Sequence, residues 1–118
     1  MQGFESQCRE FLEILDALES RDIIHADIHK NNLMLDQQGH LVLLDYGISM
    51  ILRQDNSVDY KARPGTFYRE KDGVRIYDDA YSFVMMLEGL GLPEQWKNAE
   101  IYRQVCDRVD GYTGTVTL

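Results

Sequence analysis

Apolar residues recur every three or four positions near the start of the chain, with charged residues between them. From residue 4 to residue 19 this spacing predicts an amphipathic helix, one face of which must be buried against the rest of the protein. The apolar face comprises Phe4, Cys8, Phe11, Leu12, Leu15 and Leu18. The period ends at the polar sequence Ser20-Arg21-Asp22.

Two short apolar runs in the middle of the chain are typical of β-strands. They cover residues 33–35 and 41–44, and the polar stretch between them contains Gly39. Because a glycine can take the positive φ angle of a tight turn, the pattern predicts a β-hairpin. From residue 48 to residue 62 the sequence loses clear periodicity, which predicts an exposed loop.

Two more helices are predicted in the second half of the chain. Residues 77–90 are apolar on nearly all sides, which favours a helix at the centre of the domain. Gly89, Gly91 and Pro93 are expected to end it, because glycine supplies a left-handed position and proline cannot continue the hydrogen-bond ladder. A last helix is predicted over residues 94–109, followed by a tail of β-prone residues.

These elements predict a mainly α fold with a small β-hairpin, and 118 residues are enough for a single domain over residues 1–118. With 44% hydrophobic and 27% charged residues, the composition is typical of globular proteins. A formal net charge of -8 argues against nucleic acid as a partner, because its phosphate backbone carries the same sign. The sequence lacks the pattern of a signal peptide or a membrane span, which predicts a cytoplasmic protein with no membrane partner, while export without a cleaved signal stays open.

Residues with candidate chemistry gather around the predicted hairpin. Asp27 and Asn32 precede it, and Asp45 follows it. A loop and a hairpin can aim these three oxygen-bearing side chains at one point, and carboxylate and amide oxygens are ligands that divalent cations accept. Such an arrangement suits a site for Mg²⁺ and a phosphoryl group in transfer.

The spacing of these residues resembles the catalytic loop and metal-binding Asp of the eukaryotic-type protein kinases. In His25-Ala26-Asp27 an Asp stands two residues after a His, Asn32 follows five residues later, and Asp45-Tyr46-Gly47 comes after the strand pair. The resemblance implies that residues 23–47 form the catalytic loop and metal-binding hairpin. It also implies that Asp27 accepts or orients the substrate hydroxyl, while Asn32 and Asp45 bind the Mg²⁺ that bridges the phosphates of ATP.

Further roles follow from the same resemblance. Met34 takes the position of the apolar side chain that lies under the adenine ring, and either His29 or Lys30 is the candidate for the γ-phosphate. Residues 48–70 look like an activation segment. Its shortened substrate-docking loop is marked by Gly65, Thr66, Tyr68 and Glu70.

Asp79 looks like the Asp that begins the buried central helix of the family and caps the backbone of the catalytic loop. We therefore expect its carboxylate to accept N–H groups of the loop that contains His25 and Asp27. Asp78 is expected to be an ordinary helix-start acid, so its replacement by alanine should cost less stability than that of Asp79.

Three departures from the family alter these expectations. Ala26 stands where most kinases carry an Arg that meets a phosphorylated residue, so control by that phosphorylation is not expected. His29 in place of the usual Lys is also similar to the aminoglycoside and choline phosphotransferases, although the Gly65-Thr66-x-Tyr68 sequence favours a protein substrate. Before residue 25 only one helix is predicted, so the resemblance covers a C-terminal lobe that lacks the N-terminal lobe. Whether a separate chain supplies the latter stays open.

Two functions stay open. The site chemistry favours a serine/threonine protein kinase, or its catalytic half, that uses ATP and Mg²⁺ to phosphorylate a protein hydroxyl. The alternative is a catalytically inactive kinase-like interaction module or a truncated kinase fragment, because one lobe covers only one side of the nucleotide.

Overall fold

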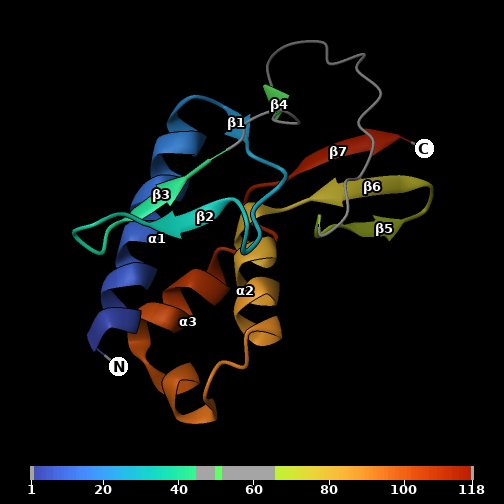
Figure 1. Ribbon diagram of the computed structural model, residues 1–118. Coiled ribbons are helices and arrows are strands. Elements are labelled where there is room, and N and C mark those ends of the chain that lie inside the picture. Colours follow the sequence, from blue (N-terminus) through green and yellow to red (C-terminus); the bar gives the residue numbers. More distant parts are fainter. Residues whose placement is uncertain (1, 45–49, 52–65, 118) are drawn as a thin grey trace.

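The computed structural model describes residues 2–44, 50–51 and 66–117. Within them, three α-helices lie together and a three-stranded sheet extends away to one side (Figure 1). In chain order the elements are α1 (Gln2–Ser20), β1 (Ile23–Ile24), β2 (Leu33–Leu35), β3 (Leu41–Leu43), β4 (Met50–Ile51), β5 (Arg69–Lys71), β6 (Val74–Tyr77), α2 (Asp79–Gly89), the 3-10 helix η1 (Glu94–Asn98), α3 (Glu100–Asp107) and β7 (Gly114–Thr117).

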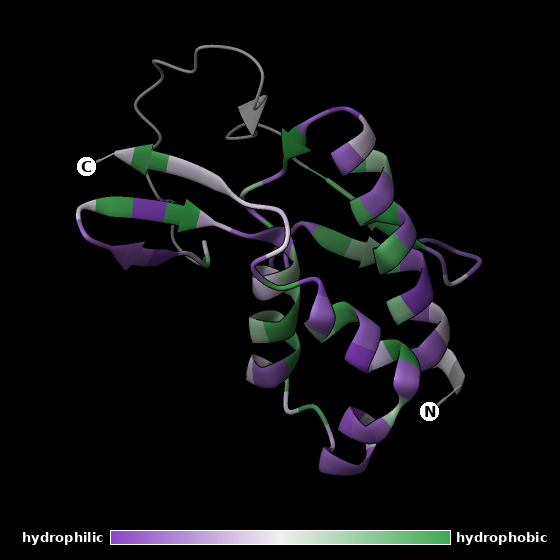
Figure 2. Cartoon of the chain, turned by 180° about the vertical axis from the view of Figure 1, so that it is seen from behind, coloured by the Kyte–Doolittle hydropathy of each residue, from purple (hydrophilic) through white to green (hydrophobic). Residues whose placement is uncertain are grey.

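The main hydrophobic core lies between the three α-helices. Figure 2 shows hydrophilic and hydrophobic residues alternating along α1, as expected of a helix with one buried face. Phe11 of α1 stacks on Phe83 of α2, with ring centroids 3.8 Å apart. The buried members of this core are Phe4, Cys8, Phe11, Leu15, Ile28, Leu33, Ala80, Phe83, Met86, Tyr102 and Val105. Across the described ranges, none of the helices is long and apolar enough to cross a membrane.

Strands β2 and β3 form the hairpin expected at this place, with Met34 opposite Val42 in the antiparallel register. Gly39 adopts a φ angle of 83° in the turn, a conformation that glycine takes without steric cost. The Asp36 carboxylate accepts the N–H groups of Gln38 and His40, so the polar turn is held by its own side chain.

Helix α2 begins at Asp79 and not at residue 77, because Tyr77 still belongs to strand β6. The helix ends as glycine predicts. Gly91 has a φ angle of 82°, its N–H donates to the carbonyl of Glu88, and the N–H of Leu92 donates to the carbonyl of Leu87. This is the hydrogen-bond pattern of a Schellman motif.

The prediction of one continuous helix over residues 94–109 is wrong. Ala99 is extended, with φ -63° and ψ 132°, and separates η1 from α3. On an unbroken helix Trp96 and Tyr102 would point about 120° apart, since six residues make one and two-thirds turns. The break lets both rings pack on Phe4, at centroid distances of 5.1 and 5.7 Å.

The fold also contains more β-structure than a single small hairpin. Strands β5, β6 and β7 form an antiparallel sheet in which Arg69 pairs with Ile76 and Tyr77 pairs with Gly114. The β5–β6 turn is Asp72-Gly73, both with positive φ, which is the signature of a two-residue hairpin turn. The β-prone tail then adds strand β7, so the described residues combine three α-helices with several small sheets, where the sequence predicted one hairpin.

A second, smaller buried cluster joins this sheet to the loop after β1. Ile24, Ala26 and Tyr77 are its buried members, and side chains from the sheet and its connections pack around them. The loop over residues 25–32 is therefore held between the helical core and the sheet (Figure 1).

Candidate functional site

The backbone of the loop over residues 25–32 is fixed from the start of α2. The Asp79 carboxylate accepts the N–H of His25 at 2.7 Å and that of Ala26 at 2.9 Å, and its side chain is buried. Burial raises the pKa of Asp79 to about 6, although the two N–H donors act in the opposite direction. The expected contact between Asp79 and the loop is therefore present.

His25 connects the same loop to the end of the β2–β3 hairpin. Its Nδ1 accepts the N–H of Asp27 at 3.1 Å, and its Nε2 lies 2.8 Å from the carbonyl oxygen of Leu44. Because Nδ1 accepts a hydrogen bond, the proton of the neutral ring sits on Nε2 and is donated to Leu44. His25 thus positions Asp27 through the backbone.

Asp27 is the centre of a cluster of hydrogen bonds. Its Oδ1 accepts the hydroxyl of Thr66 at 2.7 Å, and its Oδ2 accepts the Nδ2–H of Asn32 at 3.1 Å. Asn32 also donates to the backbone carbonyl of Asp27 at 2.9 Å. Asp27 is 1% exposed and Asn32 8% exposed, so both polar groups are held in place by partners inside the fold.

The two candidates for the γ-phosphate lie in different places. His29 Nδ1 accepts the N–H of Asn31, and its Nε2 lies 3.4 Å from Asp27 Oδ1 and 3.3 Å from the amide nitrogen of Asn32. Lys30 is exposed, and its side chain lines cavities beside α2. The structure therefore brings His29, and not Lys30, to the carboxylate of Asp27.

Met34 lies on the outer face of the hairpin with 52% of its surface exposed. Val42, directly across from it on β3, is 38% exposed. The pair forms a small apolar surface on the hairpin that carries Asn32 at one end.

A comparison with known protein families identifies the chain. Residues 9–71 match the family model described as the ABC1 atypical kinase-like domain. The match covers just over half of the chain and includes the whole loop over residues 25–32 as well as Thr66. The chain belongs to the ABC1 atypical kinase-like family. The kinase-like assignment made from the sequence is therefore confirmed, with ABC1 as the matching family.

Curated proteins similar to this ABC1 kinase-like chain include protein kinases. It is 40% identical over 47 residues to the serine/threonine-protein kinase YPK2/YKR2 of Saccharomyces cerevisiae, which is 40% of this chain and 7% of that protein. It is 37% identical to human Rho-associated protein kinase 1 over 48% of the chain and 4% of the kinase. It is 27% identical to the serine/threonine-protein kinase tricornered of Drosophila pseudoobscura pseudoobscura, over 81% of the chain and 19% of the kinase.

The ABC1 kinase-like chain spans less than a fifth of the length of each of these relatives. No solved structure matches it significantly.

Thr66 is the site residue that sequence reasoning missed. It stands 39 residues after Asp27, and its hydroxyl lies 2.7 Å from Oδ1 of that carboxylate, closer than the Asn32 amide nitrogen lies to Oδ2, at 3.1 Å. The only signal was the Gly65-Thr66 pair, which the kinase resemblance placed in the docking loop and not at the carboxylate. Glu70, from the same predicted loop, lies exposed on β5 with its carboxylate 3.6 Å from Arg75.

Asp78 is not the ordinary helix-start acid that was expected. Its side chain is fully buried, with Oδ1 accepting the N–H of Tyr81 and Oδ2 accepting from Arg69 and from the N–H of Asp110, both at 2.8 Å. Asp78 therefore caps α2 and anchors the connection that leads to β7.

The donor set of the ABC1 kinase-like site fits a divalent cation only in part within the described residues. The Asn32 amide nitrogen faces Asp27, so its carbonyl oxygen, a ligand that Mg²⁺ accepts, lies on the other branch of the amide. Asp45, Tyr46 and Gly47 lie outside the described residues. Among those that are described, there is no group of three or more His, Cys, Asp and Glu side chains placed to hold a metal.

Proposed function

We propose that this ABC1 kinase-like chain is the catalytic half of a protein serine/threonine kinase, which transfers the γ-phosphoryl group of ATP to a protein hydroxyl. The observation that carries the proposal is the buried Asp27 carboxylate with Thr66, Asn32 and His29 around it. The family match and the kinase relatives support the same class of reaction.

Asp27 is proposed to act as the catalytic base. Its oxygens accept the Thr66 hydroxyl and the Asn32 amide N–H, and its place on the loop beside His29 would bring a substrate hydroxyl to the same carboxylate. The donors hold the carboxylate in one orientation. Asp27 would orient the hydroxyl oxygen towards the phosphorus and take its proton as the new P–O bond forms.

His29 is proposed to meet the phosphoryl group that moves. Its Nε2 lies 3.4 Å from Asp27 Oδ1, and a proton on this nitrogen would stabilise the negative charge of the transferring group. Lys30 remains the second candidate from the sequence, with its side chain on the cavity side of the loop.

Asn32 and Asp45 are the proposed ligands of Mg²⁺, and Met34 with Val42 would lie under the adenine ring of ATP. When bound, Mg²⁺ neutralises the charge of the ATP phosphates and aligns them for transfer. Asn32 links metal and base, because its amide nitrogen holds Asp27 while its oxygen is left for the cation.

The second candidate function is a kinase-like interaction module without catalysis. It is favoured by the hydrogen bonds of Asp27 to Asn32, Thr66 and His25, which also stabilise the loop over residues 25–32. A carboxylate that serves the fold would be retained even in a protein that transfers no phosphate.

The deciding measurement is Mg²⁺-dependent transfer of labelled γ-phosphate from ATP to a library of serine and threonine peptides. Asp27→Asn should lower the rate by about a hundredfold or more, the size of effect that general-base catalysis contributes. Asp36→Asn is the matched control, because Asp36 also accepts backbone bonds but lies in the exposed hairpin turn. Circular dichroism must show that both variants are folded. If Asp27→Asn transfers phosphate as fast as the control, the interaction module is the better description.

A further inference from the structure

The sequence contains two Asp-Gly pairs, Asp72-Gly73 and Asp110-Gly111. Both pairs are exposed, and both aspartates have a positive φ angle, 53° for Asp72 and 68° for Asp110. An aspartate followed by glycine is chemically vulnerable, because no Cβ atom of the glycine shields its nitrogen from the side-chain carboxyl group. The structure gives the two pairs different surroundings, so the same dipeptide is expected to react at different rates.

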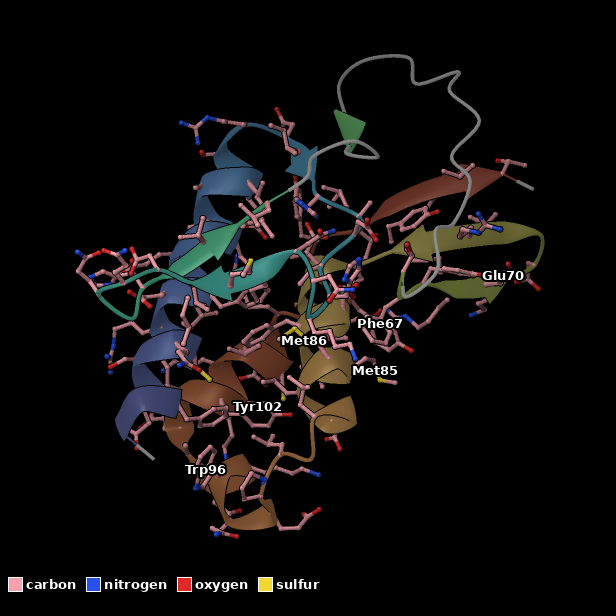
Figure 3. All side chains as sticks on the ribbon, in the orientation of Figure 1. Phe67, Glu70, Met85, Met86, Trp96 and Tyr102 are labelled. Carbon is pink, nitrogen blue, oxygen red and sulfur yellow. The ribbon has the colours of Figure 1, made fainter. Side chains whose placement is uncertain are left out.

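Asp72 and Gly73 form the turn between β5 and β6. The flanking residues Lys71 and Val74 pair directly beside the turn, so the ladder bonds are theirs and do not hold the Gly73 nitrogen. Figure 1 places this turn at the end of the sheet farthest from the helices, and Figure 3 shows Glu70 of β5 at the same outer end. A Cβ atom added to Gly73 would meet nothing within 4 Å, so there is open space around the turn.

Asp110 and Gly111 are held by hydrogen bonds instead. The Asp110 carboxylate accepts from Arg69 at 2.7 Å, and the Asp110 N–H donates to the buried carboxylate of Asp78 at 2.8 Å. The Gly111 N–H donates to the carbonyl oxygen of Arg108 at 3.1 Å. In this pair both the nitrogen that would attack and the carboxyl group that would be attacked are therefore tied to partners. The left-handed φ angle is common to both aspartates, so these hydrogen bonds are what distinguishes them.

We propose that Asp72 is a site of spontaneous conversion to iso-aspartate, and that this modification loosens the β5–β6 hairpin. The Gly73 nitrogen attacks the side-chain carboxyl carbon of Asp72. A C–N bond forms, a C–O bond of the carboxyl group breaks, and its hydroxyl leaves with the amide proton as water. A solvent water then adds to the α-carbonyl carbon of the cyclic imide and breaks the bond from that carbon to nitrogen. The backbone afterwards runs through the former side chain.

Iso-aspartate lengthens the backbone by one atom in a turn of two residues. The pairing of Lys71 with Val74 then no longer closes across the turn, and β5 loses its register at this end. Strand β5 begins at Arg69, which donates to the carboxylates of Asp78 and Asp110. The modification would therefore weaken the side of the sheet that is linked to the start of α2.

The test follows iso-aspartate in the intact chain during incubation at neutral pH and body temperature. An iso-aspartyl methyltransferase with a radiolabelled methyl donor marks the new carboxylate, and peptide mapping assigns the label to residue 72 or residue 110. In the folded chain residue 72 should collect label about tenfold faster than residue 110, because the hydrogen bonds of Asp110 and Gly111 must open before that pair can react. In the urea-unfolded chain the two residues should react at similar rates, since the dipeptide is the same.

Two matched variants assign the label to its residue. Asp72→Glu keeps the charge of the turn but would have to close a six-membered ring in place of a five-membered one, so it should lose the label at residue 72. Asp110→Glu makes the same change in the pair that is held by hydrogen bonds, and it should leave the label at residue 72 unchanged. Hydrogen exchange of the purified iso-aspartyl form should be faster at the amides of Lys71 and Val74 than in the unmodified chain.

Three results would overturn the proposal. The first is equal labelling of residues 72 and 110 in the folded chain. The second is a residue 72 that stays unlabelled in the folded chain while it reacts in the unfolded one. The third is iso-aspartate at residue 72 with unchanged hydrogen exchange in β5 and β6, which would refute the loosening of the hairpin. None of these measurements uses ATP, so they are independent of the proposed phosphoryl transfer.

Discussion

Asp78 and Asp79, neighbours at the start of α2, bind different parts of the fold. Asp79 reaches back to the N–H groups of His25 and Ala26, whereas Asp78 caps its own helix and accepts the N–H of Asp110. Both carboxylates are 1% exposed. Replacing Asp78 is therefore not expected to cost little stability, so Asp78→Ala is a poor control for Asp79→Ala. The two variants are better distinguished by the part of the fold that each one destabilises.

We predict that Asp79→Ala and Asp78→Ala both lower the free energy of unfolding. Removing Asp79 leaves two buried donors unsatisfied, at about 1 to 3 kcal/mol each. Removing Asp78 costs about 1 kcal/mol for the lost cap, and more because the N–H of Asp110 also loses its acceptor. Amide hydrogen exchange should show faster exchange at His25 and Ala26 in Asp79→Ala, and at Asp110 in Asp78→Ala. Unchanged protection of His25 and Ala26 in Asp79→Ala would contradict the contact seen here.

Ala26, which stands where most kinases have an arginine, is a buried residue of the fold. It is 1% exposed, has a φ angle of 74° and belongs to the buried cluster with Ile24 and Tyr77. A left-handed conformation costs an alanine roughly 1 to 2 kcal/mol, so the surrounding contacts must hold it. An arginine side chain at this position would have to displace its buried neighbours Ile24 and Tyr77. That phosphorylation does not control the protein through this position stays a prediction.

Site residues could be predicted from the sequence where their separation along the chain matches the kinase pattern. The positions of Asp27 and Asn32, five residues apart on one loop, were identified from the sequence, and the structure joins them by two hydrogen bonds. Thr66 was not assigned to this carboxylate, because spacing along a chain does not determine contacts across an intervening segment. The choice between His29 and Lys30 depended on side-chain direction, which adjacent positions in a loop do not reveal.

At the scale of elements, the β2–β3 hairpin is tied to α1 by one carboxylate. Glu10 accepts the N–H of Leu41 at 3.2 Å and also pairs with the imidazole of His40. This hydrogen bond and the charge of Glu10 raise the pKa of His40, with a further contribution from Asp36 in the turn. The link between hairpin and helix is therefore stronger when His40 is protonated.

This pair predicts a dependence of stability on pH. Because the folded pKa of His40 is raised above its unfolded value of about 6.5, its stabilisation is complete below that pH and is lost as the pH rises through the folded pKa. Urea unfolding of the unmodified chain and of His40→Gln should differ at pH 6 and converge at about pH 9. A difference that stays constant over this range would mean that the ion pair with Glu10 contributes nothing.

Helices and strands could be predicted where the apolar spacing was long and unbroken. They were harder to predict where packing against other elements determines their ends. Helix α1 follows directly from its apolar spacing, whereas the break at Ala99 arises because Trp96 and Tyr102 both pack on Phe4. The β5–β6 turn did carry the Asp-Gly signal at residues 72–73, yet the strands beside it are too short and too charged to show an alternating pattern.

At the scale of the whole molecule, the loop over residues 25–32 lies between two packed units. The helical core holds it through Ile28 and Leu33, and the sheet cluster holds it through Ile24 and Ala26. Pairing of β7 with β6 brings the last described strand into the unit that supports the loop. Sequence distance between these parts is large, which is why their joint role in positioning Asp27 emerges only from the fold.

The two apolar residues proposed to meet the adenine ring, Met34 and Val42, are exposed and lie opposite each other on the hairpin. Small-molecule sites usually bury about 70 to 90% of the ligand surface, and one hairpin face covers much less. We therefore predict that Mg²⁺ and ATP stabilise the 118-residue chain only slightly. A site with a dissociation constant a hundredfold below the nucleotide concentration would add about 2.7 kcal/mol to the free energy of unfolding, and we expect clearly less.

Thermal unfolding at about 1 mM ATP, with Mg²⁺ and with EDTA, measures this stabilisation. Asp45→Ala and Met34→Ser separate the proposed metal and adenine contacts, and Leu35→Ser is a control because Leu35 is an equally exposed residue of the same strand. A large Mg²⁺-dependent rise in melting temperature that Asp45→Ala abolishes and Leu35→Ser preserves would show that this chain encloses the nucleotide unaided. In that case the catalytic half would bind nucleotide as a complete unit, and a separate chain would not be needed to supply the other wall of the site.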